Sequence, residues 1–212
     1  MSTLIEQLRA ERLVAIIRGD DMRACVDTAL VLVEEGIRLL EVSLTSRDAL
    51  QAIELVAAAI GPDVALGAGT LLSADDVRRA QAAGATYAVT PAFGPATAAA
   101  VAAGLPLLAG VLTPSEVVAS LDAGADAVKI FPASVVGPGY LSALRGPFPD
   151  LAMVPVGGVG ADDVPAYLAH GAVAVGVGSP LCGDAPHGGD LEALRRRARD
   201  FLARTAATQE DR

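Results

Sequence analysis

The feature that most constrains the fold of this chain is a unit that repeats eight times along it. Each unit begins with a short, mostly apolar run, continues with a longer amphipathic segment and closes near a glycine. The runs are rich in Val, Ile, Leu and Ala and lack polar alternation, which is typical of parallel strands buried on both faces. They occupy residues 13–18, 39–44, 65–70, 87–91, 105–111, 127–132, 152–156 and 173–179.

The segments between the runs carry the start and stop signals of helices. Ser73 stands as a capping residue before two acidic residues, and Thr113-Pro114-Ser115-Glu116 places Pro at the first helical position with Glu after it. Glycines follow the helical patterns, as left-handed helix caps require, at Gly36, Gly84, Gly104, Gly124 and Gly171. Strands and helices are therefore expected to alternate along the chain.

The 212 residues divide into eight units of about 26 residues, which fits a small (β/α)8 TIM barrel. A doubly wound open sheet is the alternative, but it would more often have fewer strands and a Gly-rich dinucleotide turn where Arg18-Gly19-Asp20-Asp21 stands. We predict one α/β barrel domain over residues 1–205, with an extra N-terminal helix over 3–12. The last helix is expected from 190 to about 204, followed by a disordered tail over 206–212.

Charge and composition argue against several classes of function. A net charge of −9 is unfavourable for binding nucleic acids or anionic membranes. The apolar stretches are interrupted before they reach the ~18 residues that a membrane span needs, and no secretory leader is recognisable. Cys25, Cys182, His170 and His187 lack the spacing of metal ligands. We expect a cytoplasmic protein with free thiols and no metal, in which Arg195-Arg196-Arg197 is a solvated cationic C-terminal end of the last helix.

The only lysine of the chain stands in an unusual place. Fifteen of the 16 basic residues are Arg, and the remaining one is Lys129, inside the apolar run Ala127-Val128-Lys129-Ile130-Phe131. Side-chain alternation puts Lys129 on one face of its strand, and puts Glu41 on the same face of its own strand as Ser43. If both faces point inward, an amine and a carboxylate lie inside the barrel, where charges are costly unless they are paired.

A structural ion pair is one interpretation of Lys129 and Glu41. A simple pair could equally use Arg, which this chain has everywhere else. Arg stays protonated, whereas a desolvated lysine can lose its proton and attack a carbonyl. The pattern therefore favours a catalytic amine.

A second group of candidates follows the last two strands. Gly157-Gly158 and Gly178-Ser179 expose backbone N–H groups where barrels often bind phosphate. Each glycine on its own could simply permit a tight turn. The two pairs together favour an anion-binding site.

The motifs at these positions resemble those of the class I aldolases that cleave 2-keto-3-deoxy-6-phosphogluconate (KDPG), its galactonate epimer and 4-hydroxy-2-oxoglutarate (KHG). The resemblance extends over about residues 13–181. The motifs that carry it are Val14-Ala15-Ile16-Ile17-Arg18, Glu41-Val42-Ser43-Leu44, Gly67-Ala68-Gly69-Thr70, Thr90-Pro91, Thr113-Pro114-Ser115-Glu116, Lys129-Ile130-Phe131-Pro132-Ala133 and Pro155-Val156-Gly157-Gly158.

The resemblance implies a role for each candidate. Lys129 would form a Schiff base with pyruvate or the keto acid, and Glu41 would be the general acid and base. Arg18 and Thr70 would hold the carboxylate end of the substrate. The other implied substrate contacts are Pro91, Phe131, Val156, Gly157, Gly158, Gly178 and Ser179, with the last three holding the 6-phosphate. A homotrimer that acts on a small keto acid without metal or other cofactor is also implied.

Two positions depart from the commonest phosphogluconate pattern of this family. Thr45-Ser46 stands where Arg-Thr is usual, and Val156 stands where Thr is usual. Both departures are more similar to the galactonate branch. Val156 has nearly the shape of Thr but offers no hydroxyl to the sugar chain, so we expect the galactonate epimer to be accepted at least as well as the gluconate one.

Three functions remain open on this evidence. The first is a Schiff-base aldolase of phosphorylated sugar acids, with KHG, cleaved to pyruvate and glyoxylate, as the alternative main substrate. The second is a phosphate-binding barrel isomerase, which would share the glycines but not a buried lysine that faces a glutamate. The third is a non-catalytic anion-binding barrel in which the pair is structural.

Overall fold

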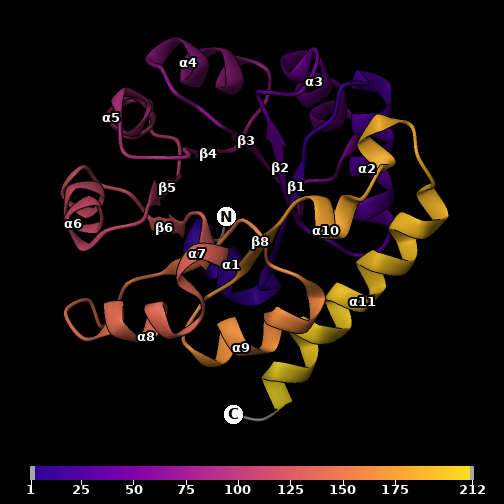
Figure 1. Cartoon of the computed structure of the whole chain (residues 1–212). Coiled ribbons are helices and arrows are strands. Elements are labelled where there is room, and N and C mark those ends of the chain that lie inside the picture. The colour runs from indigo at the N-terminus through magenta and orange to yellow at the C-terminus, as the bar shows by residue number, and fades with distance from the viewer. Residues whose placement is uncertain (1–2, 211–212) are drawn as a thin grey trace.

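The computed structural model describes residues 3–210 and contains eight parallel strands in a barrel, with helices around it (Figure 1). Every strand lies within one of the eight predicted runs, so the (β/α)8 prediction is confirmed. The strands are β1 (Leu13–Ile17), β2 (Leu39–Ser43), β3 (Ala65–Gly69), β4 (Tyr87–Val89), β5 (Leu107–Val111), β6 (Ala127–Ile130), β7 (Met153–Pro155) and β8 (Val175–Val177).

The strands are neighbours in the order β8, β1, β2 and so on to β7, which is the order of a barrel. Seven of the contacts are regular parallel ladders. Between β7 and β8 the contact is shorter: the Val173 N–H donates to the Met153 carbonyl at 2.9 Å, and Val156 bridges to Gly176. This contact brings the last strand-end loops beside one another.

The helices begin and end at the signals in the sequence. Ser73 accepts a hydrogen bond from the Asp76 N–H, and Thr113 accepts one from the Glu116 N–H. All five capping glycines have a positive φ, between +69° and +104°. The helices are α1 (Leu4–Glu11), α2 (Met22–Glu34), α3 (Ala49–Ala59), α4 (Ala74–Ala82), α5 (Pro95–Ala102), α6 (Pro114–Asp122), α7 (Ala133–Val136), α8 (Gly139–Arg145), α9 (Val164–Ala169), α10 (Ser179–Cys182) and α11 (Leu191–Glu210), with short 3-10 turns η1 (Ala161–Asp163) and η2 (Ala185–His187).

The two ends of the chain differ in how well the sequence predicted them. The N-terminal helix is present as α1. The last helix is longer than predicted, because α11 continues to Glu210 and occupies most of the expected tail; residues 211–212 lie outside the described part. Its later turns are fixed by tertiary contacts, since Phe201 is buried and Arg12 donates to the Thr205 carbonyl at 3.3 Å.

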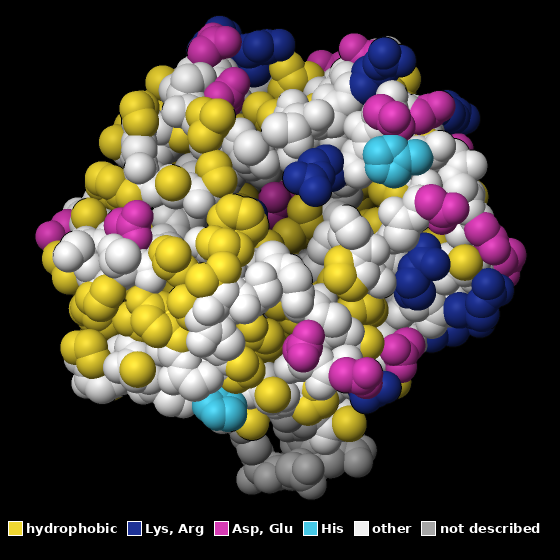
Figure 2. Space-filling model, viewed as in Figure 1, with side chains coloured by type: hydrophobic (Ala, Val, Ile, Leu, Met, Phe, Trp, Pro, Cys, Tyr) yellow, Lys and Arg dark blue, Asp and Glu magenta, His cyan; other side chains and the backbone are white. Residues whose placement is uncertain are grey.

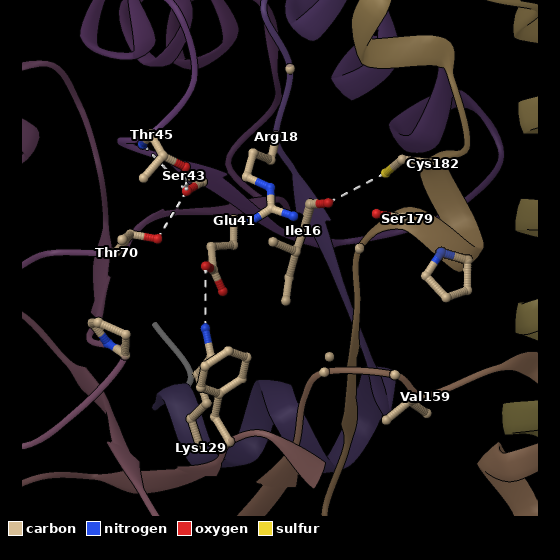
Figure 3. Close-up of a pocket in the computed structure, with 18 of the residues that line it drawn as sticks. Ile16, Arg18, Glu41, Ser43, Thr45, Thr70, Lys129, Val159, Ser179 and Cys182 are labelled. Atoms are coloured by element: carbon tan, nitrogen blue, oxygen red, sulfur yellow. Dashed lines mark hydrogen bonds and ion pairs between the residues drawn. The ribbon is translucent and has the colours of Figure 1, made fainter. Parts of the chain in front are cut away.

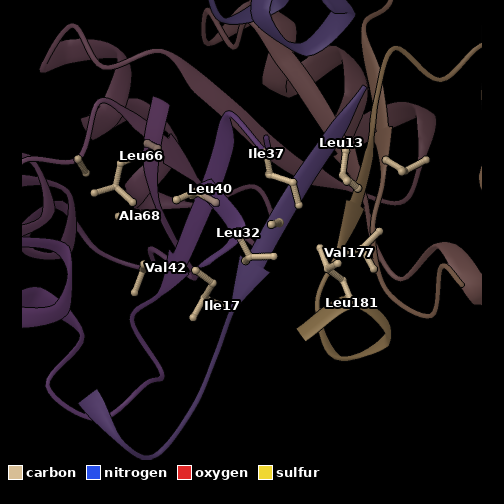
Figure 4. Packing of buried hydrophobic residues seen from close by; sticks show 14 of the residues in the cluster. Leu13, Ile17, Leu32, Ile37, Leu40, Val42, Leu66, Ala68, Val177 and Leu181 are labelled. Atoms are coloured by element: carbon tan, nitrogen blue, oxygen red, sulfur yellow. The ribbon is translucent and has the colours of Figure 1, made fainter. Parts of the chain in front are cut away.

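An apolar layer between strands and helices fixes which side chains face inward. Leu40 and Val42 of β2 pack in this layer with Leu32 and Ile37 (Figure 4). Because side chains alternate along a strand, Glu41 points to the barrel interior. A second apolar cluster, which includes Leu4, Leu8, Val14, Leu39 and Tyr87, fills the interior beside α1. In the described residues, no helix is long and apolar enough to cross a membrane.

Candidate active site

A pocket of about 860 Å³ opens at the carboxyl ends of the strands, where Figure 2 shows the face hollowed at its centre. It brings together ten of the eleven residues selected from the sequence: Arg18, Glu41, Thr70, Pro91, Lys129, Phe131, Gly157, Gly158, Gly178 and Ser179. They lie on, or shortly after, seven different strands, so the barrel places them side by side. The eleventh, Val156, does not line this pocket.

Lys129 and Glu41 meet in the deep part of the pocket. The Lys129 Nζ lies 3.5 Å from the Glu41 Oε1, and the two side chains are only 7% and 2% exposed. They reach one another from β6 and β2, across the barrel interior (Figure 3). The inward direction expected from alternation is therefore found on both strands.

The Glu41 carboxylate is tightly packed, and only one of its two oxygens has a polar partner. A Cβ on Gly69 would lie 1.9 Å from the Glu41 Oε1, so only glycine leaves room for this carboxylate beside β3. The Glu41 Oε2 is buried and accepts no hydrogen bond. Buried oxygens are normally paired, so an unpaired one in a pocket is suited to exchange a proton with a bound molecule.

A hydroxyl chain and a guanidinium form the polar end of the pocket. The Ser43 Oγ lies 2.8 Å from the Thr45 Oγ1 and 2.9 Å from the Thr70 Oγ1. Thr70 has a φ of +61°, which is uncommon for a β-branched residue. The Arg18 side chain points toward the same space (Figure 3). Hydroxyls beside an arginine are suited to hold a carboxylate. The three hydroxyls, Arg18 and the Lys129–Glu41 pair are together called the amine end of the pocket.

Phe131 and Pro91 give the pocket an apolar lining next to the amine. The Phe131 ring centre lies 5.6 Å from the Lys129 Nζ. Pro91 lies against β5, where a Cβ on Gly110 would meet the Pro91 carbonyl carbon at 2.2 Å. This lining keeps part of the surroundings of the amine free of polar groups.

The glycine end of the pocket, formed by Gly157, Gly158, Gly178 and Ser179, is built from backbone. Gly157 and Gly158 have φ values of +95° and +76°, and a Cβ on Gly158 would lie 2.7 Å from the Ser134 Cβ. Ser179 begins α10, and the first N–H groups of a helix have no acceptor within the helix. The arrangement is suited to bind an anion.

Val156 is buried next to the glycine end but does not line the pocket. Its side chain is 5% exposed and packs toward Gly176, where an added Cβ would approach the Val156 Cγ2 within 2.6 Å. Its backbone is engaged on both sides, because its N–H donates to the Ile130 carbonyl and its own carbonyl accepts from the Ala133 N–H. Val156 is therefore next to three residues that do line the pocket, Gly157, Gly158 and Gly176.

Two further titratable groups near the pocket are held neutral. Burial raises the pKa of Tyr87 well above its ordinary value, with a smaller contribution from the charge of Glu41; its hydroxyl donates to the Leu40 carbonyl at 2.7 Å. Burial raises the pKa of Cys182 to about 12, and its thiol faces the Ile16 carbonyl at 3.4 Å. Neither group is therefore a nucleophile at neutral pH. Between residues 3 and 210, no cluster of three His, Cys, Asp or Glu side chains is placed to hold a metal ion.

Some functional contacts were missed by sequence reasoning. Ser43 was predictable, because it shares the inward face of Glu41. The expectation of a solvated Arg195-Arg196-Arg197 is wrong in part. Arg195 forms ion pairs with Glu34, the last residue of α2, and with Glu35, which follows it. Arg197 donates hydrogen bonds to the Leu181 and Cys182 carbonyls of α10. Asp20 and His187, which also line the pocket, are paired across the fold. No local pattern links residues so distant in the sequence.

The family model of the KDPG and KHG aldolases matches residues 4–196 of this chain. The chain belongs to this family. It is 34% identical over 172 residues to the 2-dehydro-3-deoxy-phosphogluconate aldolase of Treponema pallidum, covering 80% of this chain and 81% of the relative. It is 35% identical over 193 residues to a probable 2-dehydro-3-deoxy-6-phosphogalactonate aldolase of Rhizobium meliloti, with 90% of each chain covered.

A solved structure agrees with the sequence relatives. The KDPG aldolase of Legionella pneumophila, with pyruvate captured as a covalent carbinolamine intermediate, has a TM-score of 0.84 and 28% identity, and the match covers 95% of this chain and 98% of that one. This aldolase is therefore a class I, pyruvate-dependent lyase that acts on a small keto acid. Family membership decides against the barrel isomerase and the non-catalytic barrel.

Proposed function

We propose that this aldolase cleaves 2-dehydro-3-deoxy-6-phosphogluconate or its galactonate epimer to pyruvate and D-glyceraldehyde 3-phosphate through a Schiff base on Lys129. The observation that carries the proposal is the buried Lys129–Glu41 pair at 3.5 Å, in a pocket that the hydroxyls and Arg18 line as well as the glycine end. An arrangement of this kind offers a nucleophile, a proton carrier and separate sites for the two anionic ends of one substrate.

The proposed reaction begins at the C2 ketone. Lys129 in its neutral form attacks C2 to give a carbinolamine, and Glu41 transfers protons as water leaves and the iminium forms. Glu41 then takes the proton of the C4 hydroxyl, the C3–C4 bond breaks, and its electron pair moves into the iminium. Glyceraldehyde 3-phosphate departs, the enamine is protonated at C3, and water releases pyruvate from Lys129.

The same residues orient the substrate. Arg18, Thr70 and Ser43 hold the carboxylate at the amine end, while N–H groups of Gly158, Gly178 and Ser179 hold the 6-phosphate. The pyruvate carbinolamine in the Legionella relative supports covalent chemistry of this class. KHG is the second candidate substrate, because its keto-acid end makes the same contacts and only its far end differs.

Borohydride reduction in the presence of pyruvate tests the covalent step. The intact protein should gain one reduced pyruvyl group, and peptide mapping should place it on Lys129. A panel of the two phosphorylated epimers, their unphosphorylated forms and KHG, read by pyruvate release, then ranks the substrates. A label on another residue would contradict the proposal.

We also propose a homotrimer in a cytoplasmic location. Exposed apolar side chains gather over α5, α6 and the neighbouring loops (Figure 2), and include Leu72, Phe93, Val101, Val118, Leu121 and Val135. Large apolar patches on soluble surfaces commonly mark interfaces. Sedimentation should give three times the chain mass, and Val118→Asp should lower it. Both cysteines are buried free thiols, which suits a reducing compartment.

A further inference from the structure

An ion pair at the rim of the pocket has no role in the chemistry described so far. The His187 Nδ1 lies 2.5 Å from the Asp20 Oδ1, and both residues line the pocket together with Gly178 and Ser179. Asp20 follows β1 and His187 ends η2, so the pair joins the loop after the first strand to the segment after the eighth. The His187 side chain is 50% exposed and the Asp20 side chain 80%, so a ligand can reach them.

The backbone that carries His187 is fixed despite this exposure. A Cβ on Gly19 would lie 2.0 Å from the Pro186 carbonyl oxygen, so the two loops touch at a point that only glycine allows. The Cys25 thiol faces the same carbonyl at 3.7 Å, and the Gly19 N–H donates to the Ser46 Oγ at 3.2 Å. Ala185 and Pro186 are buried. His187 is thus presented to the pocket from a packed turn.

The charge of the pocket shows what His187 can contribute. In the described part of the chain, the other charged residues of the lining are Arg18, Lys129, Asp20 and Glu41, whose formal charges cancel. The proposed substrate brings a carboxylate and a phosphate of about −1.5 to −2. Because Arg18 and Lys129 serve the amine end, His187 is the side chain that can bring positive charge to the phosphate.

Asp20 prepares the histidine for this role. The pKa of Asp20 is below its ordinary value, chiefly because of its hydrogen bond with His187, so the carboxylate is ionised at neutral pH. The ionised Asp20 accepts a hydrogen bond from Nδ1–H and holds the ring in one orientation, and the doubly protonated ring then has Nε2–H left for a ligand. The same geometry orients histidines at metal and catalytic sites.

We infer that His187, oriented by Asp20, donates Nε2–H to the terminal phosphate of the substrate and is a specificity-determining residue for phosphorylated over unphosphorylated keto acids. This inference rests on the proposed function and deepens it. Lys129 and Glu41 perform the bond cleavage with either kind of substrate, and His187 sets which kind is bound well.

Kinetics on three variants test the inference. In His187→Asn the KM for the phosphorylated substrate should rise about 10-fold, with kcat changed less than about twofold, while both constants for KHG stay at the wild-type level. His187→Arg keeps a cationic donor and should retain most of the preference. His170→Asn is the matched control, because the other histidine bonds to the Ala166 carbonyl on α9 and does not line the pocket.

A binding measurement separates this inference from the proposed reaction. Calorimetry with 3-phosphoglycerate and glycerate should show a preference for the phosphorylated ligand in the wild type, and the same loss of about 10-fold in His187→Asn. If the wild type neither traps pyruvate nor cleaves substrate but this loss is seen, the proposed function fails and the inference stands.

Five results would overturn the inference. The wild type could bind both ligands equally, or His187→Asn could weaken both ligands equally or neither. The Arg variant could lose as much preference as the Asn variant, which would assign His187 a structural role in η2. The His170→Asn control could show the same loss, which would make the effect nonspecific.

Discussion

The two ends of the pocket differ in whether side chains or backbone groups form them. At the amine end, side chains on strands form the site, and Lys129 and Glu41 are 7% and 2% exposed. At the glycine end, backbone turns form the wall, and the nearby His187 and Asp20 side chains are 50% and 80% exposed. A reacting amine needs a dry and rigid setting, whereas an anion that must enter and leave needs accessible N–H groups. On the proposed function, this difference assigns bond cleavage to side chains of the barrel and substrate selectivity to the loops.

The largest effect is expected for Lys129→Arg, which tests whether the amine end carries out the bond cleavage. The variant keeps the positive charge beside Glu41 but cannot form a Schiff base, because a guanidinium stays protonated. We expect kcat to fall by at least about 10⁴-fold and pyruvate trapping by borohydride to disappear, while the melting temperature stays within a few degrees. Turnover close to the wild-type value would show that the pair is structural after all.

The next largest effect is expected for Glu41→Gln. The amide keeps the shape of the side chain beside Gly69 but removes the unpaired carboxylate oxygen. Proton transfer should suffer, so kcat should fall roughly 10²–10⁴-fold with every substrate. Steady-state kinetics with KHG and the phosphorylated acids decide the matter. A change confined to KM would make Glu41 a residue that positions substrate.

At the other end, Gly158→Ala should act on binding. The new methyl group would meet Ser134 at 2.7 Å and impose a φ of +76° on a residue with a side chain. We expect the KM for phosphorylated substrates to rise about 10-fold and the constants for KHG to change little, with a loss of about 2–4 °C in Tm. Gly139→Ala is the matched control, because an added Cβ there meets nothing within 4 Å. Equal losses on both substrates would show that the two ends are coupled.

The smallest effect is expected for Val156→Thr. Because Val156 does not line the pocket, a hydroxyl there acts on the sugar chain through the neighbouring Gly157, Gly158 and Gly176. We expect the ratio of kcat/KM to shift toward the gluconate epimer by up to about 10-fold. Both epimers should be measured on both proteins. If the ratio stays constant and only Tm changes, Val156 is a packing residue of the barrel.

The amine end was more predictable from sequence than the glycine end. The buried runs of β2 and β6 fix which residues point inward, so alternation alone brings Glu41 and Lys129 together once the barrel is assumed. The pairing of Asp20 with His187 depends on two loops that touch at Gly19, a contact set by tertiary packing. The length of α11 was missed for the same reason, because Arg12 and the buried Phe201 extend it rather than any local signal.

The use of a single lysine has a practical consequence for labelling and immobilisation. Reagents that target side-chain amines have one possible destination in this sequence, Lys129. On the proposed function, coupling through lysine, which is routine for attaching proteins to surfaces or dyes, would compete with pyruvate for the Lys129 Nζ and abolish activity. For the same reason, the lysine amine that pyruvate and borohydride together remove from reaction would report the number of sites able to form the Schiff base.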